Sequence, residues 1–248
     1  MEIEINSNRL DYYLSIDKKA EVIALSFASN KLITEEILKT IITLYDSAKI
    51  EQYFKDDLFD SAYHTPITGE FEFFIARILY HLSNVKKCNW KILLRKQKNK
   101  TAPDIRLLKN NKTIAVIEIK AKAGWMQCFF SPERLDSDIK RFESHKSKLN
   151  PLDLIENQKN QLKKYYETFE ITNRNVFLLL PTFALVHRRK YTTELTGYYD
   201  YFELTSGLPR ENFVLLSENL NLNLSDPSSN GLMPSLNFEN LLTKLLKI

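Results

Sequence analysis

The stretch PDIRLLKNNKTIAVIEIK, residues 103–120, contains two apolar segments separated by a pair of asparagines. Asn110 and Asn111 suit a tight turn, because asparagine tolerates a positive φ. The segment after the turn is rich in β-branched residues, which favour strands. We therefore predict a β-hairpin whose strands are residues 104–109 and 113–122.

The second predicted strand carries charges on only one of its faces. Side chains alternate along a strand, so Glu118 and Lys120 share a face while the opposite face stays apolar. We expect the strand to begin buried on both sides and to end with one face open to polar groups. A two-residue turn places Asp104 opposite Ile117, whereas a loop one residue longer places it opposite Glu118. Directly opposed Cβ atoms lie about 5 Å apart, so Asp104 is close to Glu118 in either register.

Two carboxylates at this distance repel each other unless a cation lies between them. Mg²⁺ prefers one or two carboxylates together with water and phosphate oxygens, so Asp104 and Glu118 are candidate magnesium ligands, and we expect Mn²⁺ to substitute. The Lys120 amine can stabilise charge on a phosphate, or help to position or deprotonate an attacking water. The pattern indicates metal-assisted hydrolysis of phosphate esters.

The rest of the chain predicts an alternation of helices and strands around the hairpin. Thr34 is a plausible N-cap for a helix in the N-terminal region, because it precedes acidic and apolar residues. The resulting order of elements indicates an α/β core. The expected elements are a mainly helical region at 1–66, a helix at 70–84, strands at 90–96, 104–109 and 113–122, a helix at 151–169, strands at 175–183 and 213–218, and a closing helix at 236–248.

The composition indicates that the chain can form a packed core. The chain also has a mild excess of basic residues. It has 248 residues, 44% of them hydrophobic, and a formal net charge of +4. Its two cysteines, Cys88 and Cys128, form no Cys-x-x-Cys pair, which argues against a zinc site or a disulfide scaffold. No apolar stretch approaches the roughly 20 residues that span a bilayer, and the N-terminus does not resemble a secretory signal. We therefore expect a cytoplasmic protein that does not contact a membrane.

Motifs of several enzyme classes are missing from the sequence. We find no P-loop, no GxGxxG sequence and no Ser-His-Asp arrangement, so nucleotide hydrolases, Rossmann enzymes and triad hydrolases have no support. The four histidines are scattered without metal-ligand spacing. No linker rich in glycine and serine divides the chain. We therefore expect a single domain that spans residues 1–248.

The spacing of the candidate catalytic residues resembles the PD-(D/E)XK nuclease superfamily. Pro103-Asp104 is followed, after thirteen residues, by Glu118-Ile119-Lys120 on the predicted hairpin. This superfamily includes many type II restriction endonucleases, Holliday-junction resolvases and RecB-like exonucleases. The resemblance implies that the backbone carbonyl of Ile119 joins the two acids as a metal ligand.

The resemblance also implies a fold. It covers about residues 69–186 and implies a restriction-endonuclease-like core, with a central mixed β-sheet flanked by helices. Residues 1–66 would then form a helical N-terminal region, and residues 187–248 a C-terminal addition.

Two further features agree with this family. Many members carry a glutamate on the helix before the first strand, and Glu72 is preferred for that position over Glu70 because it points toward the sheet. Glu70 can instead be an acid that favours the start of its helix. The pattern Gln161-x-x-x-Tyr165 on the later helix marks the RecB-like branch, where the pair supports the site and approaches nucleic acid; a packing role for Tyr165 is the alternative.

Basic residues near the predicted site are candidates for DNA contact. The loop at 95–102, RKQKNKTA, holds four cations, and a basic rim favours polyanions through counterion release. A second basic group follows the apolar strand at 175–183 and precedes an aromatic stretch, a combination that suits nucleic acid. A solvated surface is the alternative in each case. The candidates are Lys98, Lys100, Lys122, Gln161, Arg188 and Arg189.

Together these features predict a magnesium-dependent endonuclease that hydrolyses phosphodiester bonds of double-stranded DNA, with a type II restriction enzyme favoured. Such enzymes commonly act as homodimers, and a DNA methyltransferase for the same site would be the expected partner. One alternative is a RecB-like repair or defence nuclease. The other is a nucleic-acid-binding module that no longer cuts.

Overall fold

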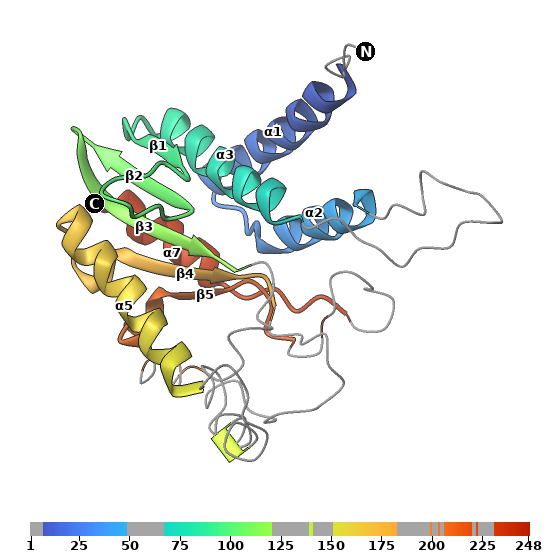
Figure 1. The fold of residues 1–248 in the computed structure, drawn as a ribbon. Coiled ribbons are helices and arrows are strands. Elements are labelled where there is room, and N and C mark those ends of the chain that lie inside the picture. The colour runs from blue at the N-terminus through green and yellow to red at the C-terminus, as the bar shows by residue number, and fades with distance from the viewer. Residues whose placement is uncertain are drawn as a thin grey trace, which may run out of the picture.

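The structure, a computed structural model, consists of helices packed around a central β-sheet (Figure 1). The helices are α1 (Ser7–Ala28), α2 (Thr34–Ser47), α3 (Thr68–Lys86), α5 (Pro151–Phe169) and α7 (Asn237–Leu246), with 3₁₀ turns η3 (Asn173–Asn175) and η4 (Arg210–Asn212). The residues that the structure describes are 7–48, 67–120, 139–140, 151–182, 199, 203, 206–219, 222 and 231–248.

The sheet has five strands in the order β1-β2-β3-β4-β5. The first three strands form antiparallel pairs, and β3, β4 and β5 run parallel to one another. A parallel pair needs a crossover connection, and α5 lies between β3 and β4 in the chain. The predicted α/β class with a mixed sheet is therefore confirmed. The strands are β1 (Lys91–Leu94), β2 (Ile105–Lys109), β3 (Lys112–Ile119), β4 (Val176–Leu180) and β5 (Phe213–Leu215).

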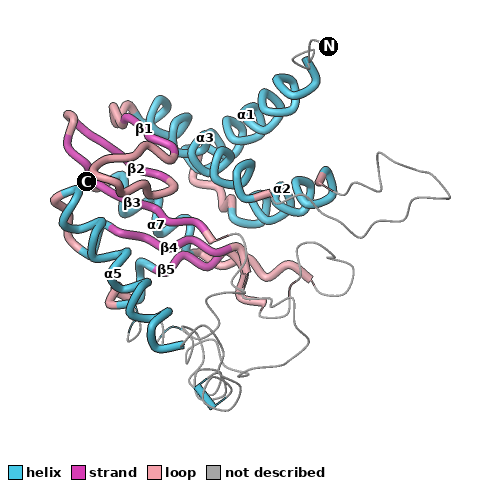
Figure 2. The backbone as a smooth tube through the Cα atoms, in the orientation of Figure 1, coloured by secondary structure: helices cyan, strands magenta, loops and turns pink. Residues whose placement is uncertain are grey.

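Helices cover both faces of the sheet (Figures 1 and 2). Helices α3 and α7 pack on one face, where α1 and α2 extend the layer and contribute to the main core. Helix α5 packs on the other face, with Leu162, Tyr165 and Phe169 buried. No helix in the described part of the chain combines the length and the apolarity needed to cross a bilayer.

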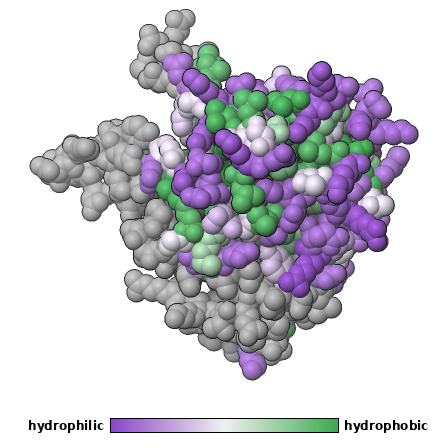
Figure 3. All heavy atoms as spheres, turned by 180° about the vertical axis from the view of Figure 1, so that it is seen from behind, coloured by the Kyte–Doolittle hydropathy of each residue, from purple (hydrophilic) through white to green (hydrophobic). Residues whose placement is uncertain are grey.

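The outer surface mixes polar and apolar side chains. Viewed from behind, apolar groups lie in small patches among polar ones (Figure 3). Helix α1 contributes several exposed apolar residues, including Leu10, Leu14, Val22 and Leu25. Scattered exposed apolar side chains are common on folded proteins, so these residues by themselves assign no partner.

The hairpin between β2 and β3 contains both a tight turn and a bulge. Lys109 pairs with Lys112 across Asn110 and Asn111, whose φ angles of 52° and 62° are those of a type I′ turn. Leu108 pairs with Thr113, but the register then shifts between Leu107 and Leu108. Ile114 is the extra residue of this β-bulge, since the next pair is Leu107 with Ala115.

The bulge determines which residue faces Asp104. Beyond it, Ile105 pairs with Ile117, so the following position brings Asp104 opposite Glu118. The two-residue turn was expected to place Asp104 opposite Ile117, and the opposition to Glu118 was expected to need a longer loop. The structure combines the two-residue turn with the pairing of Asp104 opposite Glu118, because the bulge supplies the extra residue.

The burial of β3 differs from the expectation. The strand was predicted to begin buried on both sides and to end with an open face. Instead it is exposed at Lys112, half-buried at Thr113 and Ile114, and buried from Ala115 to Ile119. The turn end of the strand is therefore exposed, whereas its charged end is covered.

A glutamate from α7 caps the start of α2. Thr34 was predicted to be the N-cap, but α2 begins at Thr34, and Ile33 at the N-cap makes no side-chain cap. The carboxylate of Glu239 instead accepts hydrogen bonds from the backbone amides of Ile33 (2.8 Å) and Thr34 (2.9 Å) and from the Thr34 hydroxyl (2.6 Å). A distant side chain thus satisfies donors that the start of any helix leaves unpaired.

We expect Glu239→Ala to lower the free energy of unfolding by about 3 kcal/mol, since it leaves buried amides without an acceptor. Urea unfolding measures this change. As a control, Glu35→Ala removes an exposed glutamate of α2 and should cost no more than about 0.5 kcal/mol. Equal costs for the two variants would contradict the capping role.

Candidate active site

Asp104 is held at the point where the ends of three strands meet. Its backbone carbonyl accepts a hydrogen bond from the amide of Arg95, just beyond β1 (2.8 Å). Its side-chain Oδ2 accepts one from the amide of Ile119, the last residue of β3 (2.7 Å). The backbone and the side chain of Asp104 are therefore both fixed, and its carboxylate lies against the end of β3.

Glu118 is the centre of a hydrogen-bond network beneath α5. Its side chain is 5% exposed. Lys120 Nζ lies 2.5 Å from Oε1, and Gln161 Nε2 lies 3.3 Å from the same atom. The Tyr165 hydroxyl donates to Oε2 at 2.7 Å. The predicted pair on the later helix thus contacts the predicted acid on the strand.

Tyr165 both packs in the interior and contacts the site, so the two roles considered for it coexist. It is 2% exposed, and its hydroxyl also accepts a hydrogen bond from Gln161 Nε2 (2.9 Å). Burial raises the pKa of the Tyr165 hydroxyl, and the negative charge of Glu118 raises it further. The hydroxyl therefore keeps its proton and acts as a fixed donor that orients Glu118.

Glu72 joins the site from α3, and Arg95 is its partner. Glu72 is 1% exposed, and the Arg95 guanidinium binds both of its carboxylate oxygens, with Nη2 2.6 Å from Oε1. Glu70, the other candidate, is half-buried in the first turn of the helix. The structure thus places the preferred glutamate at the site.

Arg95 was predicted only as one cation of a basic loop. The hydrogen bond with Glu72 raises the pKa of Arg95, and the charges of Asp104 and Glu118 raise it further. Arg95 also has a φ of 47°, a left-handed conformation that is unusual for arginine. No sequence pattern joins position 95 to position 72, so only the fold could identify this pair.

The three acids influence one another electrostatically. Burial raises the pKa of the Asp104 carboxyl to about 7, and the charges of Glu118 and Glu72 contribute to the rise. The hydrogen bond from Ile119 and the charge of Lys120 act in the opposite direction. Asp104 is thus a half-buried carboxyl that holds its proton more tightly than an exposed aspartate does.

This donor set fits a hard divalent cation. Asp104 and Glu118 supply the one or two carboxylates that Mg²⁺ prefers. The amide of Ile119 points toward Asp104, and the amide and carbonyl of one strand residue point to the same side, so its carbonyl faces Asp104 too. Within the described residues, no group of three or more His, Cys, Asp or Glu side chains is arranged to hold a metal ion. The fit therefore depends on two carboxylates and a backbone carbonyl.

Arg106, which no sequence pattern identified, adds a buried cation to the same face of the sheet. Its Nε is the one buried side-chain polar atom without a hydrogen-bond partner in the described part of the chain. Its guanidinium lies 4.8 Å from the centre of the Phe169 ring, and burial lowers the pKa of Arg106. Arg106 thus stabilises the packing of α5 by a cation–π contact.

The predicted DNA-contact residues are only partly within the described chain. Gln161 contacts Glu118, as stated above, and Lys100 lies with Gln161 along one cavity beside α5. Lys98 is exposed at the base of the turn that carries Lys100. The remaining candidates, Lys122, Arg188 and Arg189, lie outside the described residues.

Comparison with known proteins yields no match among family models, curated proteins or solved structures. Any functional assignment of this chain therefore depends on its own side chains. Asp104, Glu118 and Lys120 are brought together as predicted, Glu72 lies beside them, and Ile119 bonds to Asp104 through its backbone.

The raised pKa of Asp104 predicts how stability depends on pH when no metal is bound. The folded state holds a proton that the unfolded chain, with a reference pKa of 3.8, has already lost. Folding stability should therefore be highest below pH 4 with respect to this group, and should fall by a few kcal/mol as the pH rises to about 7.

Asp104→Asn should remove this fall, so the variant should be more stable than wild type at pH 8 in EDTA and similar to it at pH 4. Urea unfolding across this pH range measures the difference. Parallel profiles for the two proteins would show that Asp104 does not carry the extra proton.

Proposed function

We propose that the protein is a magnesium-dependent nuclease that hydrolyses phosphodiester bonds of double-stranded DNA. The observation that carries the proposal is the convergence of Asp104, Glu118 and Lys120 at the ends of two adjoining strands. A pair of acids next to a lysine amine matches what metal-assisted attack of water on a phosphate requires. The resemblance to the PD-(D/E)XK superfamily in the order and spacing of these residues supports the same reading.

In this mechanism Asp104, Glu118 and the carbonyl of Ile119 would hold the ion. When bound there, it would supply Lewis-acid stabilisation of the phosphate and would lower the pKa of a water. The amine of Lys120, already 2.5 Å from Glu118 Oε1, is placed to neutralise charge that develops on the phosphate. Tyr165 and Gln161 fix the orientation of Glu118, as groups bonded to metal ligands commonly do.

Glu72 and Arg95 support the reaction in different ways. Arg95 has a side chain that is 58% exposed while it binds a carboxylate that is almost fully buried. Its planar guanidinium suits a phosphate as well as a carboxylate. Glu72 then orders Arg95 at the rim of the site, close to where the scissile phosphate would lie. The negative charge of Glu72 also favours binding of the divalent cation.

Among nucleases of this kind, a type II restriction endonuclease acting as a homodimer is our first choice, with a DNA methyltransferase that protects the same sequence. The contact of Gln161 and Tyr165 with Glu118 favours a second candidate, a RecB-like repair or defence nuclease. A module that binds nucleic acid without cutting it has less support, because both acids and the lysine are present.

The first test is cleavage of plasmid DNA with Mg²⁺, Mn²⁺ or EDTA. We expect cleavage with either metal and none in EDTA. Asp104→Ala should lower the rate by roughly a thousandfold or more, and Lys120→Ala by on the order of a hundredfold, because each removes charge stabilisation from the transition state. Lys112→Ala, an exposed lysine at the other end of β3, is the matched control and should cut normally. Cleavage that is unaffected by Asp104→Ala would exclude this site.

The variant Tyr165→Phe tests whether the Tyr165 hydroxyl supports the reaction by orienting Glu118. It removes one donor to Glu118 while it keeps the ring that packs beneath α5, so the rate should fall by about tenfold and the fold should remain stable. Single-turnover cleavage rates and thermal unfolding measure the two effects. A wild-type rate would show that this hydrogen bond does not support the site.

The products distinguish the two candidate nucleases. A circular plasmid and a linear fragment are digested in parallel with the wild-type protein. Discrete bands from both substrates support a sequence-specific endonuclease, whereas progressive shortening of the linear fragment alone supports the RecB-like alternative.

A further inference from the structure

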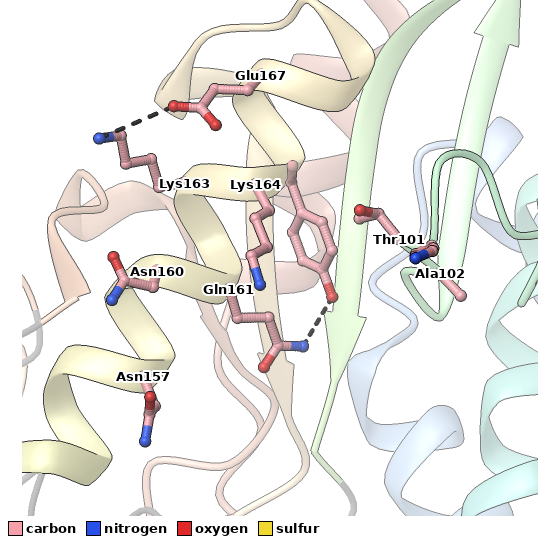
Figure 4. A pocket seen from close by; sticks show the side chains of 10 residues that line it. Thr101, Ala102, Asn157, Asn160, Gln161, Lys163, Lys164 and Glu167 are labelled. Carbon is pink, nitrogen blue, oxygen red and sulfur yellow. Dashed lines mark hydrogen bonds and ion pairs between the residues drawn. The ribbon is translucent and has the colours of Figure 1, made fainter.

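A cavity of about 680 Å³ lies between α5 and the loop that precedes β2 (Figure 4). Asn157, Asn160, Gln161 and Lys164 line it from the helix, at the spacing that places residues on one helical face. Thr101 and Ala102 lie across from them in Figure 4. The cavity is therefore a groove with one helical wall and one loop wall.

The groove leads directly to the candidate active site. Gln161 and Tyr165 line the groove, and the same two side chains donate to Glu118. A polymer bound with one phosphate at Asp104 and Glu118 would pass Gln161 as it continues into the groove. The groove is thus suited to hold the portion of the chain next to the reacting bond.

The chemistry of the groove suits a phosphate backbone. Its lining contains three lysines and one acid, Glu167, which forms an ion pair with Lys163 at 3.8 Å (Figure 4). No ion pair is found for Lys100 or Lys164 in the described part of the chain. The one aromatic residue of the lining, Tyr165, is buried, so the groove presents lysines and amides but no exposed ring on which a base could stack.

The loop wall is a hydrogen-bonded turn that holds a lysine in an unfavourable conformation. Lys98 and Thr101 exchange two backbone hydrogen bonds of 2.9 Å, with Asn99 and Lys100 between them at φ values of 49° and 62°. Glycine is the preferred residue at the second position of such a turn, whereas a lysine there is strained. The Thr101 hydroxyl lies 3.3 Å from that of Thr168, which fastens the turn to α5.

We propose that this groove binds the sugar–phosphate backbone of the DNA strand beside the bond to be cut, and that it does so without reading the bases. The proposal rests on the nuclease function proposed above. Lys100 and Lys164 each contact a phosphate. The side-chain amides of Asn157, Asn160 and Gln161 form hydrogen bonds with the sugar–phosphate backbone of the DNA. Contacts of this kind supply affinity and position but no sequence information, so base recognition belongs to another part of the protein.

The test measures binding of labelled DNA by fluorescence anisotropy in EDTA, so that no strand is cut. Two duplexes of unrelated sequence are titrated at several salt concentrations. We expect Lys100→Gly and Lys164→Ala each to weaken binding roughly fivefold to tenfold, equally for both sequences, and to lower the slope of log K against log salt by about 1.

Lys100→Gly also separates function from folding. Because glycine relieves the strained turn, this variant should melt at the same temperature as wild type or higher, although it binds DNA less well. Asn111→Gly makes the same kind of change in the hairpin turn far from the groove, so it should be equally stable and bind normally. Lys112→Ala controls for the loss of one positive charge.

The outcomes distinguish this proposal from the nuclease function. Wild-type affinity and salt slope in both groove variants would overturn the proposal that the groove binds the DNA backbone. A loss of affinity confined to one DNA sequence would also overturn it. If Lys100→Gly were destabilised, the Lys164→Ala titration would still decide. The nuclease function fails instead if Asp104→Ala leaves cleavage unchanged, a result that is independent of the binding titrations.

Discussion

The bulge at Ile114 allows the hairpin to combine a two-residue turn with a register that places the apolar side chains of both strands on one face. The tight turn alone would align the strands with Asp104 opposite Ile117, on the face away from Glu118. In that alignment Arg106 would enter the main core, where a charge is costly to bury. One surplus residue shifts the alignment, so the apolar side chains of both strands face the core and the two acids meet on the other side.

Donors from three of the surrounding elements stabilise the acids of the candidate site. Lys120 and Tyr165 occupy the oxygens of Glu118, Arg95 occupies those of Glu72, and a backbone amide binds Asp104. Asp104 accepts one backbone hydrogen bond, and burial together with the charge of Glu118 raises its pKa. The protein's own donors thus set the arrangement of the acids, and a cation that bound there would replace some of these interactions.

The sequence predicted the elements that depend on local patterns. The asparagine turn, the alternation in β3 and the periodicity of α5 each follow from nearby residues, and the predicted bounds of α5 agree with the structure. The bulge was missed because its cause is a conflict between two local signals. The pairing of Arg95 with Glu72 and the cap that Glu239 provides for α2 were missed because they join residues far apart in the chain. The position of Glu72 was predicted correctly, because helical periodicity indicates which side of α3 faces the sheet.

The dependence of α2 on Glu239 has a consequence for the order in which the protein is made. The ribosome synthesises α2 before every strand of the sheet, yet the acceptor for its first amides is in α7, which follows all the other described elements. Helix α2 therefore cannot reach its final stability until α7 has been synthesised and has packed against it.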